Sequence, residues 1–211
     1  MSLTVADSAL LPDSGPDRVP VQKLDGTVAG VFVVPEGSRV ESVPVPALRL
    51  DFEGAVGDRH YGITRYAGAR EPWYPRDTVI SNTRQVSVLS VEEMAIVAAR
   101  LGVPELRAEW IGGTVLIGGI PRLSFLPAGT RIFFAGGASL LVTEQNGPCR
   151  IAGRAITAHF PDRPELELEF PKQARGLRGI VAAVERPGTV TPGSAVEVRV
   201  PEQWIYRPQG G

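Results

Sequence analysis

Short hydrophobic runs of the β type, separated by glycine and proline, follow one another along most of the chain. They are rich in β-branched and aromatic side chains, which favour extended backbone, while the intervening glycines and prolines favour turns. Many short strands with such turn signals are typical of a β-barrel. We therefore predict a mainly β fold, a closed or nearly closed barrel with a few short helices, whose strands span 28–34, 48–52, 85–89, 114–117, 130–134, 139–143, 179–184 and 195–200.

One of these helices has clear start and stop signals. Ser90 followed by Glu93 fits a capping box, and apolar residues then recur at helical spacing until Gly102 and Pro104 end the run. Farther along, the segment 162–169 alternates charged residues with leucine, which predicts a solvated strand or loop. We interpret His159, just before it, as a packed or capping imidazole.

The long stretch 66–83 predicts a loop over one mouth of the barrel. It contains Tyr66, Trp73 and Tyr74 among several prolines. Aromatic side chains in such a loop either line a ligand pocket, or close it as a lid, or anchor the loop to the barrel. The sequence does not decide between these interpretations.

Composition indicates one globular domain between two flexible ends. Hydrophobic residues make up 43% of the 211 residues, enough to bury a sizeable core. Residues 1–20 contain Asp7 and the run Asp13-Ser14-Gly15-Pro16-Asp17 and lack periodicity, and 206–211 are equally irregular. We therefore predict a flexible arm, a single barrel domain over 21–205, and a flexible tail.

Charge and cysteine content exclude several classes of function. The net charge of −1 argues against nucleic acid or a membrane as the main partner, so any anion site must be local. A single cysteine excludes an internal disulfide and a protein-bound iron–sulfur cluster. With no leader pattern at the N-terminus and no run of membrane-spanning length, we expect a cytoplasmic protein.

The single cysteine, Cys149, stands in an unusual place for a structural thiol. It follows a strand-like run and a turn, Asn146-Gly147-Pro148, and precedes the permanently cationic Arg150. A cationic neighbour favours the reactive thiolate. Cys149 is therefore a candidate nucleophile or a ligand to a soft metal.

Other polar residues come in glycine-rich turns. In the segment 57–62, Asp58 could orient its neighbours, Arg59 could hold an oxyanion and His60 could exchange a proton. Arg84 begins a predicted strand, where it can point into a barrel mouth, and Arg178 lies between glycines that allow an anion to approach the backbone. Each turn alone is also compatible with an ordinary surface role.

Together these segments resemble the MOSC family, the domain named after the C-terminus of molybdenum cofactor sulfurase. The similarity extends over roughly 21–200, and its elements occur in the order of the family: the turn 57–62, the strand 84–87 with Ser90 after it, Pro127-Ala128-Gly129-Thr130, Pro148-Cys149, Arg178-Gly179, and the segment 188–193. Two segments depart from the family pattern, since the chain reads Glu109-Trp110-Ile111 where many members have Glu-Asn-Ile, and Asn146-Gly147 where many have an arginine.

This resemblance implies a β-barrel that binds the molybdenum cofactor, molybdopterin, with Cys149 as the ligand to molybdenum or as a carrier of sulfur. Molybdenum binds sulfur strongly, so a cysteine thiolate suits it. The phosphate of the pterin needs fixed donors, for which Arg59, Arg84, Arg150 and Arg178 are candidates, and Asn146 could pair with the edge of its ring.

Three functions follow as alternatives. The first is a molybdenum enzyme that reduces N-hydroxylated compounds with electrons from a separate reductase. The second is a carrier of the cofactor, or of persulfide sulfur received from a donor protein, on Cys149. The third is a metal-free cysteine enzyme with His60 or His159 as the base.

Overall fold

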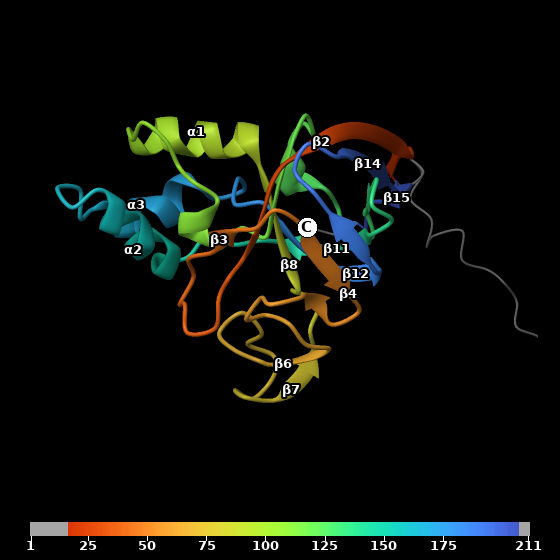
Figure 1. The fold of residues 1–211 in the computed structure, drawn as a ribbon, viewed down its shortest axis with the longest axis horizontal. Coiled ribbons are helices and arrows are strands. Elements are labelled where there is room, and N and C mark those ends of the chain that lie inside the picture. The colour runs from red at the N-terminus through yellow and green to blue at the C-terminus, as the bar shows by residue number, and fades with distance from the viewer. Residues whose placement is uncertain (1–16, 207–211) are drawn as a thin grey trace, which may run out of the picture.

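A computed structural model describes residues 17–206. Seven of its strands form a closed barrel in the order β14–β10–β11–β12–β8–β9–β2, and β2 pairs with β14 to close the ring (Figure 1). The predicted mainly β barrel is thus confirmed. Its strands are β2 (Gln22–Val33), β8 (Val86–Ser90), β9 (Val115–Gly118), β10 (Arg131–Phe134), β11 (Ser139–Gln145), β12 (Ile180–Arg186) and β14 (Ala195–Val200).

Barrel closure joins segments from both ends of the sequence. Strand β14 pairs with β2 antiparallel from Ala195 opposite Thr27 to Val200 opposite Gln22. Six of the seven neighbouring pairs are antiparallel, and β8 with β9 is the parallel one. Parallel neighbours require a crossover connection, and helix α1 (Val91–Leu101) supplies it.

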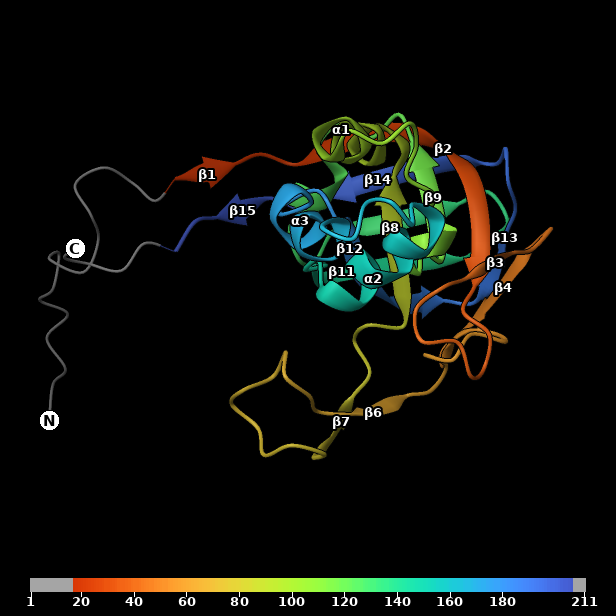
Figure 2. The same cartoon turned by 90° about the vertical axis from the view of Figure 1, so that its left-hand side faces the viewer.

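Small pairs of strands surround the barrel. Strand β3 (Val43–Pro44) pairs antiparallel with the end of β2. A separate sheet contains β13 (Gly188–Val190), β4 (Leu48–Asp51) and β5 (Gly54–Ala55). Strands β6 (Thr64–Tyr66) and β7 (Val79–Ser81) form a hairpin that projects from the barrel (Figure 2). The stretch 66–83, which we predicted as a loop, thus includes the end of β6 and all of β7.

The expected flexible ends lie mostly outside the described residues. Within the N-terminal arm, however, β1 (Arg18–Val19) pairs with β15 (Gln203–Trp204), so these two residues belong to a strand ladder. Of the predicted C-terminal tail only Tyr206 is described.

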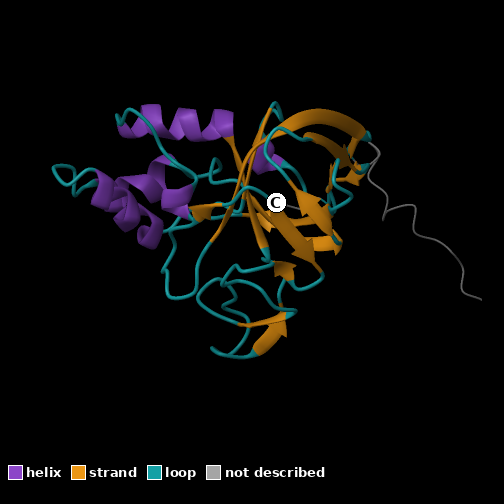
Figure 3. Cartoon of the chain, in the orientation of Figure 1, coloured by secondary structure: helices purple, strands orange, loops and turns teal. Residues whose placement is uncertain are grey.

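The capping signals of α1 are confirmed. The Ser90 side chain accepts a hydrogen bond from the Glu93 amide at 3.2 Å, and Gly102 ends the helix in the left-handed conformation with φ of 64°. Two further helices, α2 (Arg150–His159) and α3 (Leu166–Gln173), gather with α1 on one side of the barrel (Figure 3). No helix within residues 17–206 has the length and apolar character needed to span a membrane.

Helix α3 shows that the strand or loop predicted for 162–169 was wrong over 166–169. Leu166 and Phe170, four residues apart, are fully buried, whereas the charged residues between them face outward. Spacing of four places both side chains on one helical face. The alternation of charge and leucine resembled a strand because Leu168, on the opposite face, is half-exposed.

Two hydrophobic clusters meet along strand β8. Val86 and Val88 point into the barrel, where they pack with side chains such as Ile132 and Ile180. Leu89 points outward and belongs to a second cluster, which α1, α2 and α3 cover. Alternation along one strand thus builds the barrel interior on one side and the helical layer on the other.

A buried carboxylate fastens α1 to the barrel. Glu93 is 4% exposed and accepts hydrogen bonds from the Ser124 hydroxyl at 2.6 Å and the Ser124 amide at 3.0 Å. The Ser124 hydroxyl in turn accepts from the Gly179 amide at 2.7 Å, and its carbonyl accepts from Gln145 at 2.9 Å. Burial raises the pKa of Glu93, and the Ser124 hydrogen bonds oppose this rise.

We expect Ser124→Ala to destabilise the fold by about 1–3 kcal/mol, because it removes the hydroxyl hydrogen bond to the buried Glu93 carboxylate and leaves the Gly179 amide without its acceptor. Urea denaturation followed by circular dichroism measures this change in the free energy of unfolding. Ser194→Ala is the matched control, since that hydroxyl bonds only to the Thr191 carbonyl in an exposed turn. Equal stability of the two variants would contradict the structural role of Ser124.

Candidate functional site

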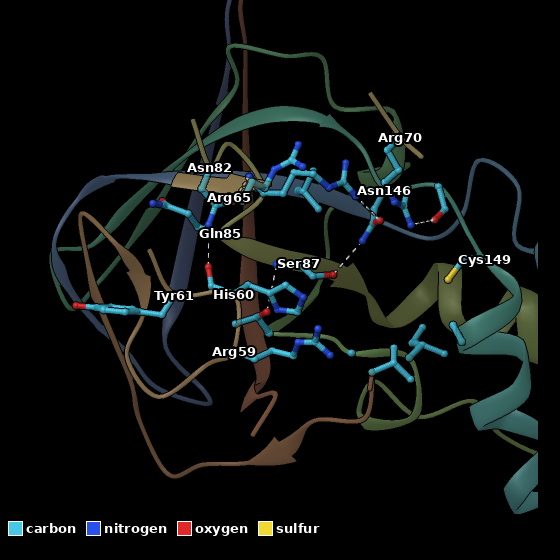
Figure 4. Close-up of a pocket in the computed structure, with 18 of the residues that line it drawn as sticks. Arg59, His60, Tyr61, Arg65, Arg70, Asn82, Gln85, Ser87, Asn146 and Cys149 are labelled. Carbon is cyan, nitrogen blue, oxygen red and sulfur yellow. Dashed lines mark hydrogen bonds between the residues drawn. The ribbon is translucent and has the colours of Figure 1, made fainter. Parts of the chain in front are cut away.

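A cavity of about 640 Å³ lies beside the barrel, between the outer faces of β8 and β12, the start of α2 and the β6–β7 hairpin (Figure 4). Ser87 of β8 and Val181 of β12 line it. Their inward-facing neighbours, Val88 and Ile180, pack the barrel core. We expected the site in a barrel mouth, but the alternation of side chains places it against the outer wall of the barrel.

The lining of this cavity is strongly cationic. Six arginines line it and no aspartate or glutamate does; the arginines are Arg39, Arg59, Arg65, Arg70, Arg84 and Arg178. Arg65 is paired with Glu71 at 2.6 Å and Arg84 with Glu144 at 2.7 Å. Within residues 17–206 the other four form no ion pair, so the cavity has an excess of positive charge that an anionic ligand would balance.

Arg178 is the most deeply placed of the six. It is 7% exposed and donates hydrogen bonds to the Ser87 hydroxyl at 3.3 Å and to the Ile111 carbonyl. Burial lowers its pKa to about 10, and attraction to Cys149 opposes that change. Since a pKa of about 10 is far above neutral, Arg178 is a buried cation next to the cysteine at physiological pH.

Arg84 is held by a chain of polar contacts. It donates to the Asn146 side-chain oxygen at 3.1 Å, and the Asn146 amide donates to the Ser87 hydroxyl at 3.2 Å. The pKa of Arg84 is lowered by burial, while its hydrogen bond to Glu144 opposes the change. Because the Ser87 oxygen already accepts from Arg178 and Asn146, its own hydrogen remains able to bind a ligand.

Cys149 lies at the wall of this cavity, immediately before α2. It is partly buried, has an extended backbone with φ of −137°, and packs against the outer hydrophobic cluster. Its carbonyl accepts the Gly153 amide at 3.1 Å, while its side chain makes no capping hydrogen bond. The sulfur is thus the soft ligand atom within a lining of hard cationic donors.

The turn 57–62 brings an imidazole to the same cavity. The Asp58 side chain is fully buried and accepts from the Val34 amide at 2.8 Å, from the His60 amide at 2.8 Å and from the His60 ring Nδ1 at 2.7 Å. This arrangement requires a proton on Nδ1 and leaves Nε2 of the half-exposed ring without a hydrogen bond to any described residue. Asp58 itself does not line the cavity.

Arg59 is fixed by backbone carbonyls. Its Nη1 donates to the carbonyls of Ser38 at 2.5 Å and Arg39 at 2.9 Å, which leaves the remaining guanidinium donors able to bind a ligand. Gly57 and Gly62 have φ of 86° and 143°, values that favour glycine and allow this sharp turn.

Arg150, a candidate from sequence, does not line the cavity. Its side chain is 66% exposed and forms an ion pair with Glu167 at 2.8 Å, next to Arg154. Hydrogen bonds from Arg154 and Arg150 lower the pKa of Glu167 to about 2. Arg150 therefore fastens α2 to α3.

His159 is packed, as expected, and lies apart from the other candidate ligands. Its ring stacks on Trp110 with centroids 4.2 Å apart, and Nε2 is 3.2 Å from Glu41. Over the described part of the chain, no group of three His, Cys, Asp or Glu residues is arranged to hold a metal ion. A cluster of purely protein ligands around Cys149 is thus not formed there.

Several lining residues had not been singled out from the sequence: Arg39, Arg65, Arg70 and Ser87. Alternation places Ser87 opposite Val86 and Val88, and this signal could have identified it. The three isolated arginines, Arg65 in β6 and the other two in loops, give no such signal. Of the loop aromatics, Tyr66 lines the cavity, whereas Trp73 is 70% exposed and neither lines the cavity nor anchors the loop.

A family model of the MOSC domain matches residues 75–197, more than half of the chain. The chain belongs to the MOSC family. The resemblance inferred from the order of the motifs is therefore confirmed, although the match by itself identifies neither ligand nor reaction.

Relatives show the same family. A protein of Bacillus subtilis (strain 168) is 39% identical over 186 residues, 88% of this chain and 96% of its own, and has the name "Putative metal-sulfur cluster biosynthesis proteins YuaD". The crystal structure of B. subtilis YuaD superposes with a TM-score of 0.83 at 40% identity, covering 85% of this chain and 98% of that one. A hypothetical protein with a TM-score of 0.51 and 18% identity, covering 82% and 69% of the two chains, shares the fold.

We expect Arg178→Gln to weaken binding of inorganic pyrophosphate, because the variant lacks the buried cation of the cavity. Isothermal titration at low ionic strength should show a loss of about 1.5–3 kcal/mol, typical of one charge-assisted hydrogen bond. Arg186→Gln removes an exposed arginine at the end of β12 and serves as the control. A similar loss of binding free energy in both variants would show that pyrophosphate binding depends only on the net charge of the protein.

Proposed function

We propose that this protein binds the molybdenum cofactor in the cationic cavity, with Cys149 as the protein ligand to molybdenum, and supports the reduction of N-hydroxylated compounds. The observation that carries this proposal is the combination of six arginines, no lining carboxylate and one cysteine around a single cavity. This donor set suits a ligand with a thiophilic metal at one position and a phosphate at another.

The residues present fit the cofactor. Arg59, Arg84 and Arg178 offer fixed donors to a phosphate, whereas Arg150 is engaged by Glu167. Asn146 uses its oxygen on Arg84 and one amide hydrogen on Ser87, so one further hydrogen can pair with a pterin edge. When bound, the cofactor would supply a two-electron redox centre.

His60 has the geometry of a proton donor. Reduction of R–NHOH to R–NH₂ and water consumes two electrons and two protons, so the departing hydroxyl oxygen must be protonated. Because Asp58 holds the Nδ1 hydrogen, it stabilises the doubly protonated ring, and in that imidazolium form Nε2 is the atom that can pass a proton to a ligand in the cavity. The electrons must come from a separate reductase, since a chain with one cysteine cannot hold an iron–sulfur cluster of its own.

Cofactor binding is tested by the metal content of protein expressed in a host that makes the cofactor. We expect molybdenum and pterin in near-equal amounts in the wild type and much less molybdenum in Cys149→Ser, because a hydroxyl is a far weaker ligand to a thiophilic metal. Mass spectrometry of the metal and fluorescence of the oxidised pterin measure both. Equal, negligible molybdenum in the two proteins would contradict the proposal.

The role of His60 is tested in the molybdenum-loaded protein. We expect His60→Gln to lower kcat about 100-fold, the usual contribution of a general acid, while molybdenum content and KM change little. Asp58→Asn should show a similar loss in kcat, because an amide cannot accept from both Val34 and His60 and lacks the negative charge that stabilises the protonated ring. Unchanged kcat in both variants would show that another group or water delivers the proton.

A second candidate function is delivery of sulfur from a persulfide on Cys149. It is supported by the position of Cys149 at the wall of an open cavity and by the name of YuaD, which refers to metal–sulfur cluster biosynthesis. It predicts sulfane sulfur on Cys149 and its transfer in molybdenum-free protein. The metal-free cysteine enzyme is less well supported, because within residues 17–206 neither His60 nor His159 forms a hydrogen bond with the Cys149 sulfur, and His159 stacks on Trp110.

A further inference from the structure

We propose that the tip of the β6–β7 hairpin is the docking surface for the acidic face of an electron-carrier protein. This inference rests on the proposed reductive function, which requires an external reductant. The residues proposed to contact the partner are Trp73, Tyr74 and Arg76, none of which lines the cavity.

The hairpin exposes an unusual amount of aromatic surface. Trp73 is 70% exposed and Tyr74 47%, and their rings lie 6.3 Å apart. On the adjoining strands Tyr66 is 69% exposed and Val79 61%. Trp, Tyr and Arg are the residues that most often dominate the binding energy of protein interfaces, and large exposed apolar patches mark such interfaces.

A buried ion pair makes this surface rigid before any partner binds. Arg65 and Glu71 pair at 2.6 Å inside the loop, and the second Glu71 oxygen accepts the Gly68 amide at 3.0 Å. The Arg65 hydrogen bond lowers the pKa of Glu71 to about 2, so the pair stays ionised at neutral pH. Pro72 and Pro75, which flank the aromatic pair, restrict the backbone further. A preformed loop loses less entropy when it docks.

The same hairpin borders the cavity. Tyr66 and Val79 are directly paired across the two strands and both line the cavity, so the aromatic surface continues to its edge. Arg70 also lines it and donates to the Gly147 carbonyl at 3.3 Å, two residues before Cys149. A carrier bound to the hairpin would therefore lie next to the redox site.

Charge selects an acidic partner over a second copy of this chain. Glu71 is engaged inside the loop, so the remaining charged residues of the tip are Arg70, Arg76 and the exposed Asp77, and within residues 17–206 neither arginine forms an ion pair. The neighbouring cavity adds further unpaired arginines such as Arg39 and Arg59. A symmetric dimer through this surface would bring like charges together, whereas an acidic surface would be attracted.

The test compares two reductants of the molybdenum-loaded protein. With an acidic plant-type [2Fe–2S] ferredoxin as donor, we expect the double variant W73A/Y74A to raise the KM for ferredoxin at least about tenfold, as for interface hot spots. Arg76→Gln should raise this KM less and weaken its dependence on salt. With reduced methyl viologen, which needs no docking surface, both variants should turn over an amidoxime at the wild-type rate. Trp204→Ala, an equally exposed tryptophan on β15, is the control.

The outcomes separate the two proposals. Absence of turnover with methyl viologen would contradict the reductive function, and binding of ferredoxin to the metal-free protein, measured by titration calorimetry, would still decide whether the hairpin docks an acidic carrier. Wild-type KM and wild-type affinity for ferredoxin in W73A/Y74A would overturn the docking proposal. So would loss of a dimer, or of binding to anionic lipid vesicles, as the only effect of that variant.

Discussion

The alternation of side chains along β8 is the constraint on which the barrel, the helical layer and the cavity all depend. Val86 and Val88 point inward and must be apolar because the closed barrel has no solvent inside. Ser87 and Leu89 consequently point outward, Leu89 beneath the helices and Ser87 into the cavity. A shift of one residue in register would exchange these faces and would destroy the core and the site together.

The carboxylates around the cavity build its scaffold without neutralising it. Asp58 uses its oxygens on Val34 and His60, Glu71 holds Arg65 and the Gly68 amide, and Glu144 pairs with Arg84. None of these acids lines the cavity, whereas the side chains they position, His60, Arg65 and Arg84, do. The unpaired arginines, Arg178 above all, retain their attraction for a ligand. Hydrogen bonds to Ser87 and Ile111 offset part of the cost of burying Arg178, and a bound anion would offset more of it.

The sequence predicted the features that local patterns determine. Strands with glycine and proline at their ends and the capping box of α1 agree with the structure, as does the family inferred from the order of the motifs. It missed α2 and α3, because their buried faces are short: Ala152, Gly153 and Ile156 in α2, and Leu166 and Phe170 in α3. It also missed Arg39, Arg65 and Arg70, since residues far apart in sequence meet only once the barrel has closed.

Cys149 shows most clearly that the residues adjacent to a side chain in sequence do not determine its surroundings in the fold. Arg150 follows Cys149 directly and is the first residue of α2. The Arg150 side chain points away from the cavity and pairs with Glu167. The cation attracted to Cys149 is Arg178, which lines the same cavity and precedes β12. Its neighbour Gly179 donates to the Ser124 hydroxyl. The Ser124 hydroxyl in turn donates to Glu93 of α1. The electrostatic surroundings of Cys149 therefore depend on a helix that is distant from it in the sequence. The position of the positive charge near Cys149 thus depends on both the barrel and the helical layer. Any reaction at the Cys149 sulfur therefore depends on both as well.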